Sequence, residues 1–415
     1  MKILYLCSDY GIPIFGIKGA SVHMRSLARG FHREGDELTI VSPRLDLPDG
    51  RPSDLNVVEL RLTEAEQVVL KELRGAEKFL QKKNRVPNEV RSLLYNRHLA
   101  TYLRQRLASQ PVDFILERYS LFSYAGLQVA REFGVPFLLE VNAILTREQE
   151  AMRGLHLKDV ALAIEDQLFR QADRILTVSD WLKEYITSRG VPSERIRVLP
   201  NGIDPELFPQ DEQQRRQFRQ QLGGDEHFLV GFSGSLKSWH GMELLIEVLP
   251  ELIEQIPKVK TVIIGDGPMG ESLRQLTRQL GVDDRVVFTG RVEHEAIGSY
   301  LAALDVAVAP YRKRTDFYFS PIKIFEYMAA GVPIVTTPQG QISRILTDGK
   351  TGLFFPAEDR QQFIRQIVRL YREPDLRHKL AQNARNLVMQ RYTWQQNVRQ
   401  IKRLVEELLA TQNKE

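Results

Sequence analysis

Residues 318–335, YFSPIKIFEYMAAGVPIV, place a proline, a lysine and a glutamate at the start of a strongly apolar segment. The run DVAVAP at 305–310 precedes this segment, and the run PIVTT at 333–337 overlaps its end. Strand, helix and strand in this order predict a parallel β-α-β unit, because parallel strands need a crossover connection. Proline is favoured in the first turn of a helix, so we expect the helix to begin at Pro321 with Ser320 as its N-cap.

The same alternation of short apolar runs and longer periodic segments extends through both halves of the chain. KILYLC, VDFILE, VPFLLEV and ADRILTV in the first half have the composition of buried strands, as do FLVGFS, KTVIIG and RVVFTG in the second. This alternation predicts an α/β fold with two Rossmann-like, doubly wound parallel sheets. Residues 242–256, MELLIEVLPELIEQI, predict a helix with a kink at Pro250.

A proline-rich segment at 200–210, PNGIDPELFPQ, separates the two halves. Proline and glycine at this density are typical of a linker, and 415 residues are too many for one hydrophobic core of ordinary size. We therefore expect one domain at 1–200, a second at 201–385 and a helical tail at 386–415. Two such halves predict a cleft between the carboxyl ends of two sheets.

The composition restricts the class of protein. The single cysteine, Cys7, excludes an intrachain disulfide and a cysteine-rich metal site. The N-terminal apolar run is too short for a signal peptide and is expected to form the first strand, and no stretch of about 18 uninterrupted apolar residues could span a bilayer. A cytoplasmic protein is expected. The net charge of +4 is compatible with anionic small molecules or an acidic membrane surface and does not require nucleic acid.

Residues 64–109 differ from the surrounding pattern, because they are long, charged and rich in leucine, glutamine and basic residues. This composition predicts one or two surface helices inserted between strands. Two interpretations stay open: a solvated helix face, or a surface for anionic lipid or a lipid-linked phosphate at the cytoplasmic side of a membrane. The basic residues of the segment are Lys71, Arg74, Lys78, Lys82, Lys83, Arg85, Arg91, Arg97, Arg104 and Arg106.

Three glycine-containing loops follow predicted strands. In GIKGAS, Gly16 and Gly19 would let backbone N–H groups approach a ligand at a helix start, although an ordinary loop fits equally well. The loop is not the dinucleotide fingerprint, because the third glycine is missing. In IIGDGPM, Asp266 and Gly267 form a turn whose carboxylate would bind a ribose or cap the next helix.

The loop SGSLKSWHG at 233–241 predicts a phosphate site, because small residues, two basic side chains and a helix start coincide. A tight turn with a surface lysine is the alternative. The residues assigned to the site are Ser233, Gly234, Ser235, Lys237 and His240, with Lys237 and His240 expected to supply positive charge.

The segment at 318–335 predicts a second anion site. The free N–H groups around Ser320, Pro321 and Ile322, with Lys323 beside them, would bind a diphosphate. The carboxylate of Glu326 lies about one turn further and would accept hydrogen bonds from a ribose diol. The alternative is a Lys–Glu pair at i, i+3, which stabilises a helix by only a few tenths of a kcal/mol. Two cationic helix starts together suggest a nucleoside diphosphate.

These motifs together resemble the retaining glycosyltransferases of family 4, the glycosyl transferase group 1 family, which have the GT-B fold of two facing Rossmann-like domains. The resemblance covers nearly the whole chain and rests on LTVSDWLKEYI, VLPNGID, GSLKSWHG, GDGP and SPIKIFEYMAAGVPIV. It implies an N-terminal acceptor domain, a C-terminal domain for a nucleotide-sugar donor and a last helix that crosses back to the first domain. It also implies catalysis without a metal ion or other cofactor, and a glycan, a lipid-linked compound or a small molecule as acceptor.

The resemblance also assigns roles to particular residues. Lys237 and Lys323 would neutralise the departing diphosphate, Glu326 would hold the donor, and Asn142 would hydrogen-bond the donor sugar where a histidine often stands. The sugar would pass through an oxocarbenium-like state, with the acceptor hydroxyl attacking the same face.

The chain departs from the family pattern at several positions. Ser235 and His240 stand where many members carry an arginine and a lysine, and Tyr318 replaces the first of two glutamates, with Asp316 as a possible substitute. Glu117 and Glu140, at strand ends, would orient the acceptor.

Three other functions are compatible with such a chain. A nucleotide-sugar 2-epimerase of the same fold would need acid–base groups, and the eight histidines do not indicate an obvious pair. A pyridoxal-dependent phosphorylase is usually longer and needs a cofactor lysine that the sequence does not identify. A non-catalytic nucleotide-sugar-binding protein would bind the donor without releasing nucleotide.

Overall fold

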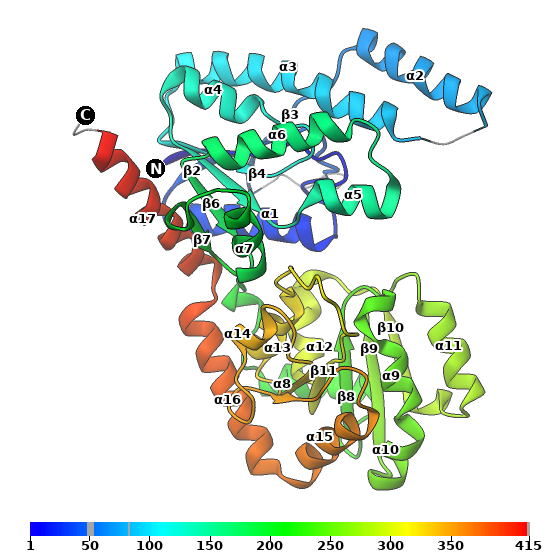
Figure 1. The fold of residues 1–415 in the computed structure, drawn as a ribbon. Helices are drawn as coiled ribbons and strands as arrows, with labels where there is room; N and C mark the ends of the chain where they lie inside the picture. The colour runs from blue at the N-terminus through cyan, green and yellow to red at the C-terminus, as the bar shows by residue number, and fades with distance from the viewer. Residues whose placement is uncertain (48–53, 82–83, 413–415) are drawn as a thin grey trace. The chain divides into compact units, whose positions relative to one another are not determined.

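The computed structural model describes residues 1–47, 54–81 and 84–412 (Figure 1). The chain forms two compact units, Met1–Pro200 with Trp394–Glu415, and Asn201–Thr393. The division at Pro200 lies at the position expected from the proline-rich segment. The boundary expected at 385 is wrong, because it falls inside helix α16 (Pro374–Arg391), which packs on helix α13 (Ile322–Ala330) of the second unit. Only the last helix, α17 (Trp394–Gln412), belongs to the first unit.

The first unit contains a seven-stranded parallel sheet in the order β3-β2-β1-β4-β5-β6-β7. The chain starts in the middle of this sheet, builds one side and then returns to build the other, as the doubly wound prediction requires. The strands are β1 (Lys2–Cys7), β2 (Glu37–Ser42), β3 (Asn56–Glu59), β4 (Phe114–Arg118), β5 (Phe137–Val141), β6 (Arg174–Thr177) and β7 (Ile196–Val198).

Helices surround this sheet and complete its core (Figure 1). Helix α17 packs on α1 (Gly19–Arg33), and Trp394 and Val398 of α17 share a hydrophobic cluster with Tyr5 and Phe114 of the sheet. The other helices are α2 (Glu64–Phe79), α3 (Val86–Ser109), α4 (Ala125–Phe133), α5 (Leu145–Arg153), α6 (Lys158–Gln171) and α7 (Asp180–Ser188). Helices α2 and α3 form the insertion that the composition of 64–109 predicts.

The second unit contains a six-stranded parallel sheet in the order β10-β9-β8-β11-β12-β13. Its strands are β8 (Phe228–Ser233), β9 (Val259–Ile264), β10 (Val286–Gly290), β11 (Val306–Ala309), β12 (Ile334–Thr336) and β13 (Leu353–Phe354). Besides α13 and α16, its helices are α8 (Glu212–Leu222), α9 (Met242–Glu247), α10 (Leu249–Gln255), α11 (Gly270–Gln279), α12 (Ile297–Ala302), α14 (Ile342–Ile345) and α15 (Arg360–Arg372). The predicted kink at Pro250 is confirmed as the break between α9 and α10.

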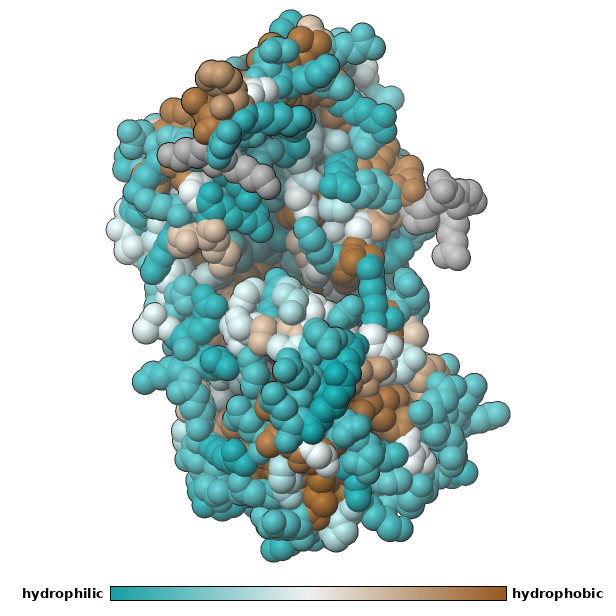
Figure 2. All heavy atoms as spheres, turned by 90° about the vertical axis from the view of Figure 1, so that its right-hand side faces the viewer, coloured by the Kyte–Doolittle hydropathy of each residue, from teal (hydrophilic) through white to brown (hydrophobic). Residues whose placement is uncertain are grey.

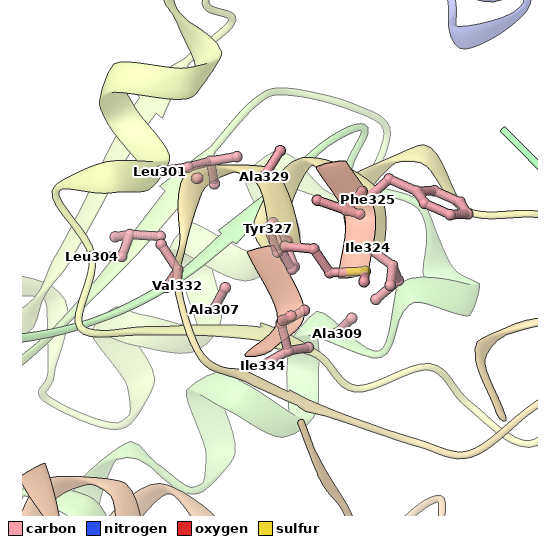
Figure 3. Close-up of a cluster of buried hydrophobic side chains, with 14 of the residues drawn as sticks. Leu301, Leu304, Ala307, Ala309, Ile324, Phe325, Tyr327, Ala329, Val332 and Ile334 are labelled. Carbon is pink, nitrogen blue, oxygen red and sulfur yellow. The ribbon is translucent and has the colours of Figure 1, made fainter. Parts of the chain in front are cut away.

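The segment at 318–335 forms the predicted β-α-β unit. β11 pairs in parallel with β12, with Ala307 opposite Ile334, and α13 connects the two strands. Nearly every side chain of α13 is buried, and Figure 3 shows Ile324 and Tyr327 of this helix among the apolar side chains of both strands and of α12. The apolar character of the segment is therefore explained by a helix enclosed between a sheet and other helices.

The start of α13 differs from the prediction by one residue. Pro321 is the N-cap and no side chain caps the helix, so Ser320 is not the N-cap. The Ser320 side chain is buried and accepts a hydrogen bond from the Asn201 backbone N–H at 3.2 Å instead. Asn201 Nδ2 also donates to the Ser320 carbonyl at 2.6 Å, so the proline-rich segment is fixed to the start of α13.

Candidate active site

The predicted donor residues of the second unit gather where its sheet changes direction. The chain passes from β8 outward to β9 and β10, and β11 then starts the other side of the sheet next to β8. Ligands of doubly wound sheets bind outside the carboxyl ends of the strands at such a switch point. The loop after β8 carries Ser233 to Gly241, the loop after β9 carries Asp266 and Gly267, and the segment after β11 leads to Lys323 and Glu326.

Backbone hydrogen bonds join the first two of these loops. The Gly234 N–H donates to the Ile264 carbonyl at 2.8 Å, and the Leu236 N–H donates to the Asp266 carbonyl at 3.1 Å. A Cβ atom on Gly267 would lie 2.5 Å from the Leu236 nitrogen, so only glycine allows this approach. The Asp266 carboxylate accepts from the Gly267 N–H at 2.8 Å, whereas the N-cap of α11 is Met269. The helix-cap interpretation of Asp266 is therefore wrong.

Lys323 is a buried lysine at the switch point. Its Nζ lies 3.7 Å from the centroid of the Phe232 ring and 5.6 Å from that of Tyr311, and a Cβ atom on Gly234 would lie 3.0 Å from it. Within the described part of the chain this Nζ has no hydrogen-bond partner. Burial lowers the pKa of Lys323 well below its usual range, the charge of Lys237 lowers it further, and Glu326 opposes the shift. An anion beside Gly234 would favour the charged form of Lys323 and supply the acceptors that its Nζ lacks.

Glu326 lies one turn further along α13 and is buried. Burial raises the pKa of its carboxyl group, and the nearby charges of His294 and Lys323 oppose this rise. His294, on the short helix η5 (His294–Ala296), places Nδ1 3.9 Å from Glu326 Oε1. No ion pair within 4.0 Å joins Lys323 to Glu326 in the described ranges, so the two side chains do not form the simple i, i+3 pair of the alternative interpretation.

His240 is not a cation in this site. It ends the short helix η3 (Ser238–His240), and its Nδ1 lies 2.6 Å from the Ser235 carbonyl oxygen, where an N–H would donate. Burial, followed by the charges of Lys323 and Lys237, lowers the pKa of His240 to about 2, and the hydrogen bond to Ser235 opposes this shift only in part. The imidazole is therefore neutral at pH 7, and the expected positive charge at this position is corrected.

Lys237 lies in the loop after β8. Its side chain is exposed, and Nζ lies 4.6 Å from the centroid of the Trp239 ring. Ser233 is buried, with an Oγ that has no partner in the described residues, and its backbone N–H donates to the Tyr327 hydroxyl at 2.8 Å. The sequence analysis did not identify Phe232, Tyr311 or Trp239, whose rings lie against the two lysines. Their positions at or next to the loops that follow β8 and β11 could have indicated that they belong to the site.

Ile322 begins α13 and is half-buried. Tyr318 is half-buried too, and its ring packs edge-on against Phe319 at 5.6 Å. Asp316, the possible substitute for the glutamate that Tyr318 replaces, is bound by Arg314. Nε and Nη2 of Arg314 each donate to one carboxylate oxygen at 3.1 Å. The Asp316 carboxylate is thus held by a partner on its own loop.

The first unit carries the remaining predicted residues. Asn142 follows β5, and its buried Oδ1 has no hydrogen-bond partner among the residues that the structure describes. The Gly16 carbonyl accepts from Arg25 Nη1 at 2.6 Å, and Gly19 is the first residue of α1.

Glu117 and Glu140 are both enclosed. Ser123 Oγ donates to Glu117 at 2.5 Å, and the Tyr5 hydroxyl donates to Glu140 at 2.7 Å. His23 and Arg118 also face Glu140, so both carboxylates serve internal contacts and the expectation that they orient an acceptor is not supported.

Comparison with known proteins agrees with this geometry. The family model described as Glycosyltransferase Family 4 matches residues 17–207, and the one described as Glycosyl transferases group 1 matches residues 227–373. The first match covers most of the first unit and extends a few residues into the second, the other lies within the second unit, and together they cover most of the chain. The chain belongs to this glycosyltransferase family.

Relatives of this glycosyltransferase extend over both units. An uncharacterized glycosyltransferase of Methanocaldococcus jannaschii is 25% identical over 410 residues, which are 95% of each chain. A GDP-mannose-dependent alpha-(1-6)-phosphatidylinositol monomannoside mannosyltransferase of Mycolicibacterium smegmatis is 29% identical over 245 residues, 58% of this chain and 64% of the relative. The crystal structure of Anabaena Alr3699/HepE in complex with UDP matches with a TM-score of 0.70 at 18% identity, over 100% of both chains, and shows the shared GT-B fold.

The site of this glycosyltransferase thus combines a buried and an exposed lysine with a buried carboxyl group at one sheet edge. Such an arrangement can bind an anion and hydroxyl groups at the same time. Across the described helices, none is both long and apolar enough to cross a membrane.

Proposed function

We propose that this glycosyltransferase moves a sugar from a nucleoside diphosphate sugar to an acceptor hydroxyl, with retention of the anomeric configuration and without a metal ion. The observation that supports this most directly is the buried Lys323 ammonium group, which lies beside Gly234 at the switch point without a hydrogen-bond partner among the described residues. The names of relatives agree with such a donor, since one is GDP-mannose-dependent and a structural neighbour was solved with UDP.

In this proposal the diphosphate occupies the space between Gly234 and the start of α13. Lys323 donates to phosphate oxygens from one side, and Lys237 adds a second positive charge at the exposed rim. The N-terminal N–H groups of α13 also favour an anion. Because these charges are already in place, they stabilise the negative charge that develops as the diphosphate leaves. The carboxylate of Glu326 accepts hydrogen bonds from the ribose hydroxyls.

The bond changes balance without a side-chain nucleophile. The bond between the anomeric carbon and the diphosphate oxygen breaks, and the departing oxygen takes both electrons. The acceptor oxygen then bonds to the same face of the sugar, and its proton passes to the departing phosphate oxygen. In this scheme Asn142 of the first unit donates a hydrogen bond to the donor sugar, because its amide offers donors but carries no transferable proton.

The acceptor is proposed to be a hydroxyl group of a glycan, a lipid-linked compound or a small molecule. We extend the proposal to the location of the reaction, the cytoplasmic face of a membrane, reached through the helical insertion of the first unit. The α2–α3 insertion supports this location, because it is an addition between β3 and β4 that exposes basic side chains.

A thermal-shift series tests the donor site. Nucleoside diphosphates and their sugars are added to the wild type, to Lys323→Met and to the control Lys379→Met, which removes an exposed lysine of α16, each with and without EDTA. At 100 times its Kd a ligand adds about 2.7 kcal/mol of stability, which is about 5–10 °C for a domain of this size. The shift should vanish in Lys323→Met, persist in the control and be unaffected by EDTA.

Two further measurements separate the alternatives. A binding protein without activity would show the thermal shift but release no nucleoside diphosphate from the sugar donor. An epimerase would invert one carbon of the sugar without transferring the sugar to an acceptor. NMR of the product reports the anomeric configuration, and inversion would contradict the retaining mechanism. If no nucleotide shifts the wild type, the donor site itself is wrong.

A further inference from the structure

Helix α2 and its C-cap residue, Leu80, expose four large apolar side chains. Phe79 is 86% exposed, Leu80 63% and Val68 57%, and Val69 is exposed as well. These residues lie within 13 positions of each other at one edge of the first unit (Figure 1). Single exposed apolar side chains need no explanation, whereas several together on one element indicate a surface that meets another apolar phase.

The inward face of α2 packs against α3. Leu70 is buried, Glu66 Oε2 lies 2.6 Å from His98 Nε2, and Glu77 accepts a hydrogen bond from the Asn84 backbone N–H at 2.9 Å. Thr63 and Glu66 form a capping box that fixes the first turn. The helix is therefore well formed and is held on the face that contacts α3. The exposure of its apolar side chains on the other side is not the result of poor packing.

Helical geometry places two of the exposed residues opposite the buried Leu70. At about 100° per residue, Val68 and Phe79 fall within about 20° of each other and about 160–180° from Leu70, whereas Val69 and Leu80 lie about 80–100° from it. Lys71, Arg74 and Lys78 are exposed and follow at i, i+3 and i+7, so they form one stripe beside the apolar face. Of the acidic residues of α2, Glu66 and Glu77 are turned toward α3 and the chain that enters it, whereas Glu64 and Glu72 are exposed. Glu72 lies about 40° from Val68 around the helix, so the apolar face includes one carboxylate.

The sequence beyond the helix extends the positive charge. Residues 71–85 hold six basic residues and two acidic ones. Two of the basic residues, Lys82 and Lys83, lie outside the described residues. Figure 2 views the molecule from the side on which α2 lies in Figure 1, and it shows hydrophobic spheres exposed among hydrophilic ones in the first unit. Apolar and basic side chains thus share one face of the insertion.

We propose that α2 is an interfacial helix that docks this glycosyltransferase on an anionic phospholipid surface. Val68, Phe79 and Leu80 enter the boundary between head groups and acyl chains, while Lys71, Arg74 and Lys78 lie at the level of the lipid phosphates. The positive stripe selects this partner over a second copy of the chain, because two such stripes would repel each other. This contact deepens the membrane location proposed above and rests on it, but it does not involve the donor site, so its failure would leave the nucleotide-binding test unaffected.

Vesicle cosedimentation of the full chain tests the contact, with phosphatidylcholine vesicles compared to vesicles that also contain phosphatidylglycerol. The triple variant Lys71→Gln/Arg74→Gln/Lys78→Gln is matched by a control in α15, Arg365→Gln/Arg369→Gln/Arg372→Gln, which removes the same charge from exposed positions. Each cation near an anionic surface raises the affinity for vesicles roughly fivefold at low salt, so the α2 variant should bind anionic vesicles about 100-fold more weakly. The control should bind like the wild type.

An apolar pair completes the design. Phe79→Ser/Leu80→Ser should reduce vesicle binding by at least about tenfold, while the control Phe133→Ser/Met152→Ser, at exposed apolar positions of the same unit, should not. Far-ultraviolet circular dichroism verifies that each variant is folded. Wild-type binding that does not depend on anionic lipid, or α2 variants that bind no more weakly than their controls, would overturn the proposal.

Discussion

Two buried glutamates on neighbouring strands are expected to give the first unit opposite responses to pH. Glu117 lies on β4 and Glu140 on β5, and these strands pair directly. Burial raises the pKa of Glu117 to about 7, against a smaller lowering by the Ser123 hydrogen bond. Burial also favours the neutral form of Glu140, but the charge and hydrogen bond of His23, with Arg118 and Tyr5, outweigh it and lower the pKa to about 2.

The direction in which each glutamate changes the free energy of unfolding with pH follows from the ordinary glutamate pKa of 4.5 in the unfolded chain. The pKa of Glu117 is higher in the folded state than in the unfolded chain. Its contribution to the free energy of unfolding is therefore fully present below pH 4.5 and is lost as the pH rises to about 7 and above. The folded pKa of Glu140 is lower, so its contribution is present above pH 4.5 and is lost as the pH falls toward 2. At about 1.4 kcal/mol per pKa unit, each difference corresponds to about 3 kcal/mol.

Glutamine has the same shape and does not titrate in this range, so Glu117→Gln and Glu140→Gln are matched tests of the same substitution. Relative to the wild type, Glu117→Gln should gain about 3 kcal/mol in free energy of unfolding between pH 4.5 and 8. Glu140→Gln should instead be destabilised by about 3 kcal/mol at pH 7, and this deficit should shrink as the pH falls toward 3.

Tryptophan fluorescence can follow the first unit by itself. The chain has three tryptophans, and Trp181 and Trp394 belong to the first unit while Trp239 belongs to the second. In a Trp239→Phe background, urea unfolding at a series of pH values therefore reports the unit that contains both glutamates. If the difference between Glu117→Gln and the wild type does not change between pH 5 and 8, the carboxyl group is not held neutral by burial and the reasoning fails.

Three further predictions concern the second unit and the insertion. Gly241 has a φ of +69°, and a Cβ atom there would lie 2.0 Å from the Pro310 carbonyl, so Gly241→Ala should lower the free energy of unfolding by at least about 1–2 kcal/mol. The control Gly75→Ala, in α2 with open space around it, should raise it by up to about 1 kcal/mol; equal effects in thermal unfolding would contradict the steric explanation. Asn201→Ala should destabilise the protein by about 1–3 kcal/mol because it leaves the buried Ser320 carbonyl unpaired, whereas Ser320→Ala keeps that bond and should have a smaller effect in urea unfolding. His294→Gln removes a charge that lowers the pKa of Glu326. The affinity for nucleoside diphosphate should therefore begin to fall at a higher pH on acidification, as calorimetry between pH 5 and 8 would show. An unchanged pH profile would mean that His294 does not act on the site.

Much of the fold could be predicted because it depends on local patterns. Short apolar runs that alternate with longer periodic segments predict parallel strands, and both units contain a parallel sheet built from such runs. The boundary at 385 could not be placed in this way, because α16 and α17 follow each other as helices with only residues 392–393 between them. Their separation depends on Arg385, which donates to the Ala329 carbonyl of α13, and on Trp394, which packs against His23 of α1.

The candidate site was predicted as a set of loops, but not as an arrangement of charges. Lys237, Lys323, Glu326 and the glycines could be found because cations and small residues follow strands and precede helices. His294 could not be found, since η5 follows β10 and nothing in its sequence points to a carboxylate on α13.

The sequence by itself determined two parallel sheets, their linker, and the loops that carry the proposed donor residues, because each depends on residues close together in the chain. The tertiary structure alone decided the state of these residues. His240 is neutral because burial and two lysines from other positions lower its pKa. Lys323 lies against Phe232 where α13 meets the end of β8, at which the Ser233 N–H donates to the Tyr327 hydroxyl. Burial and neighbouring charge set such properties, and both arise only when segments distant in sequence come together.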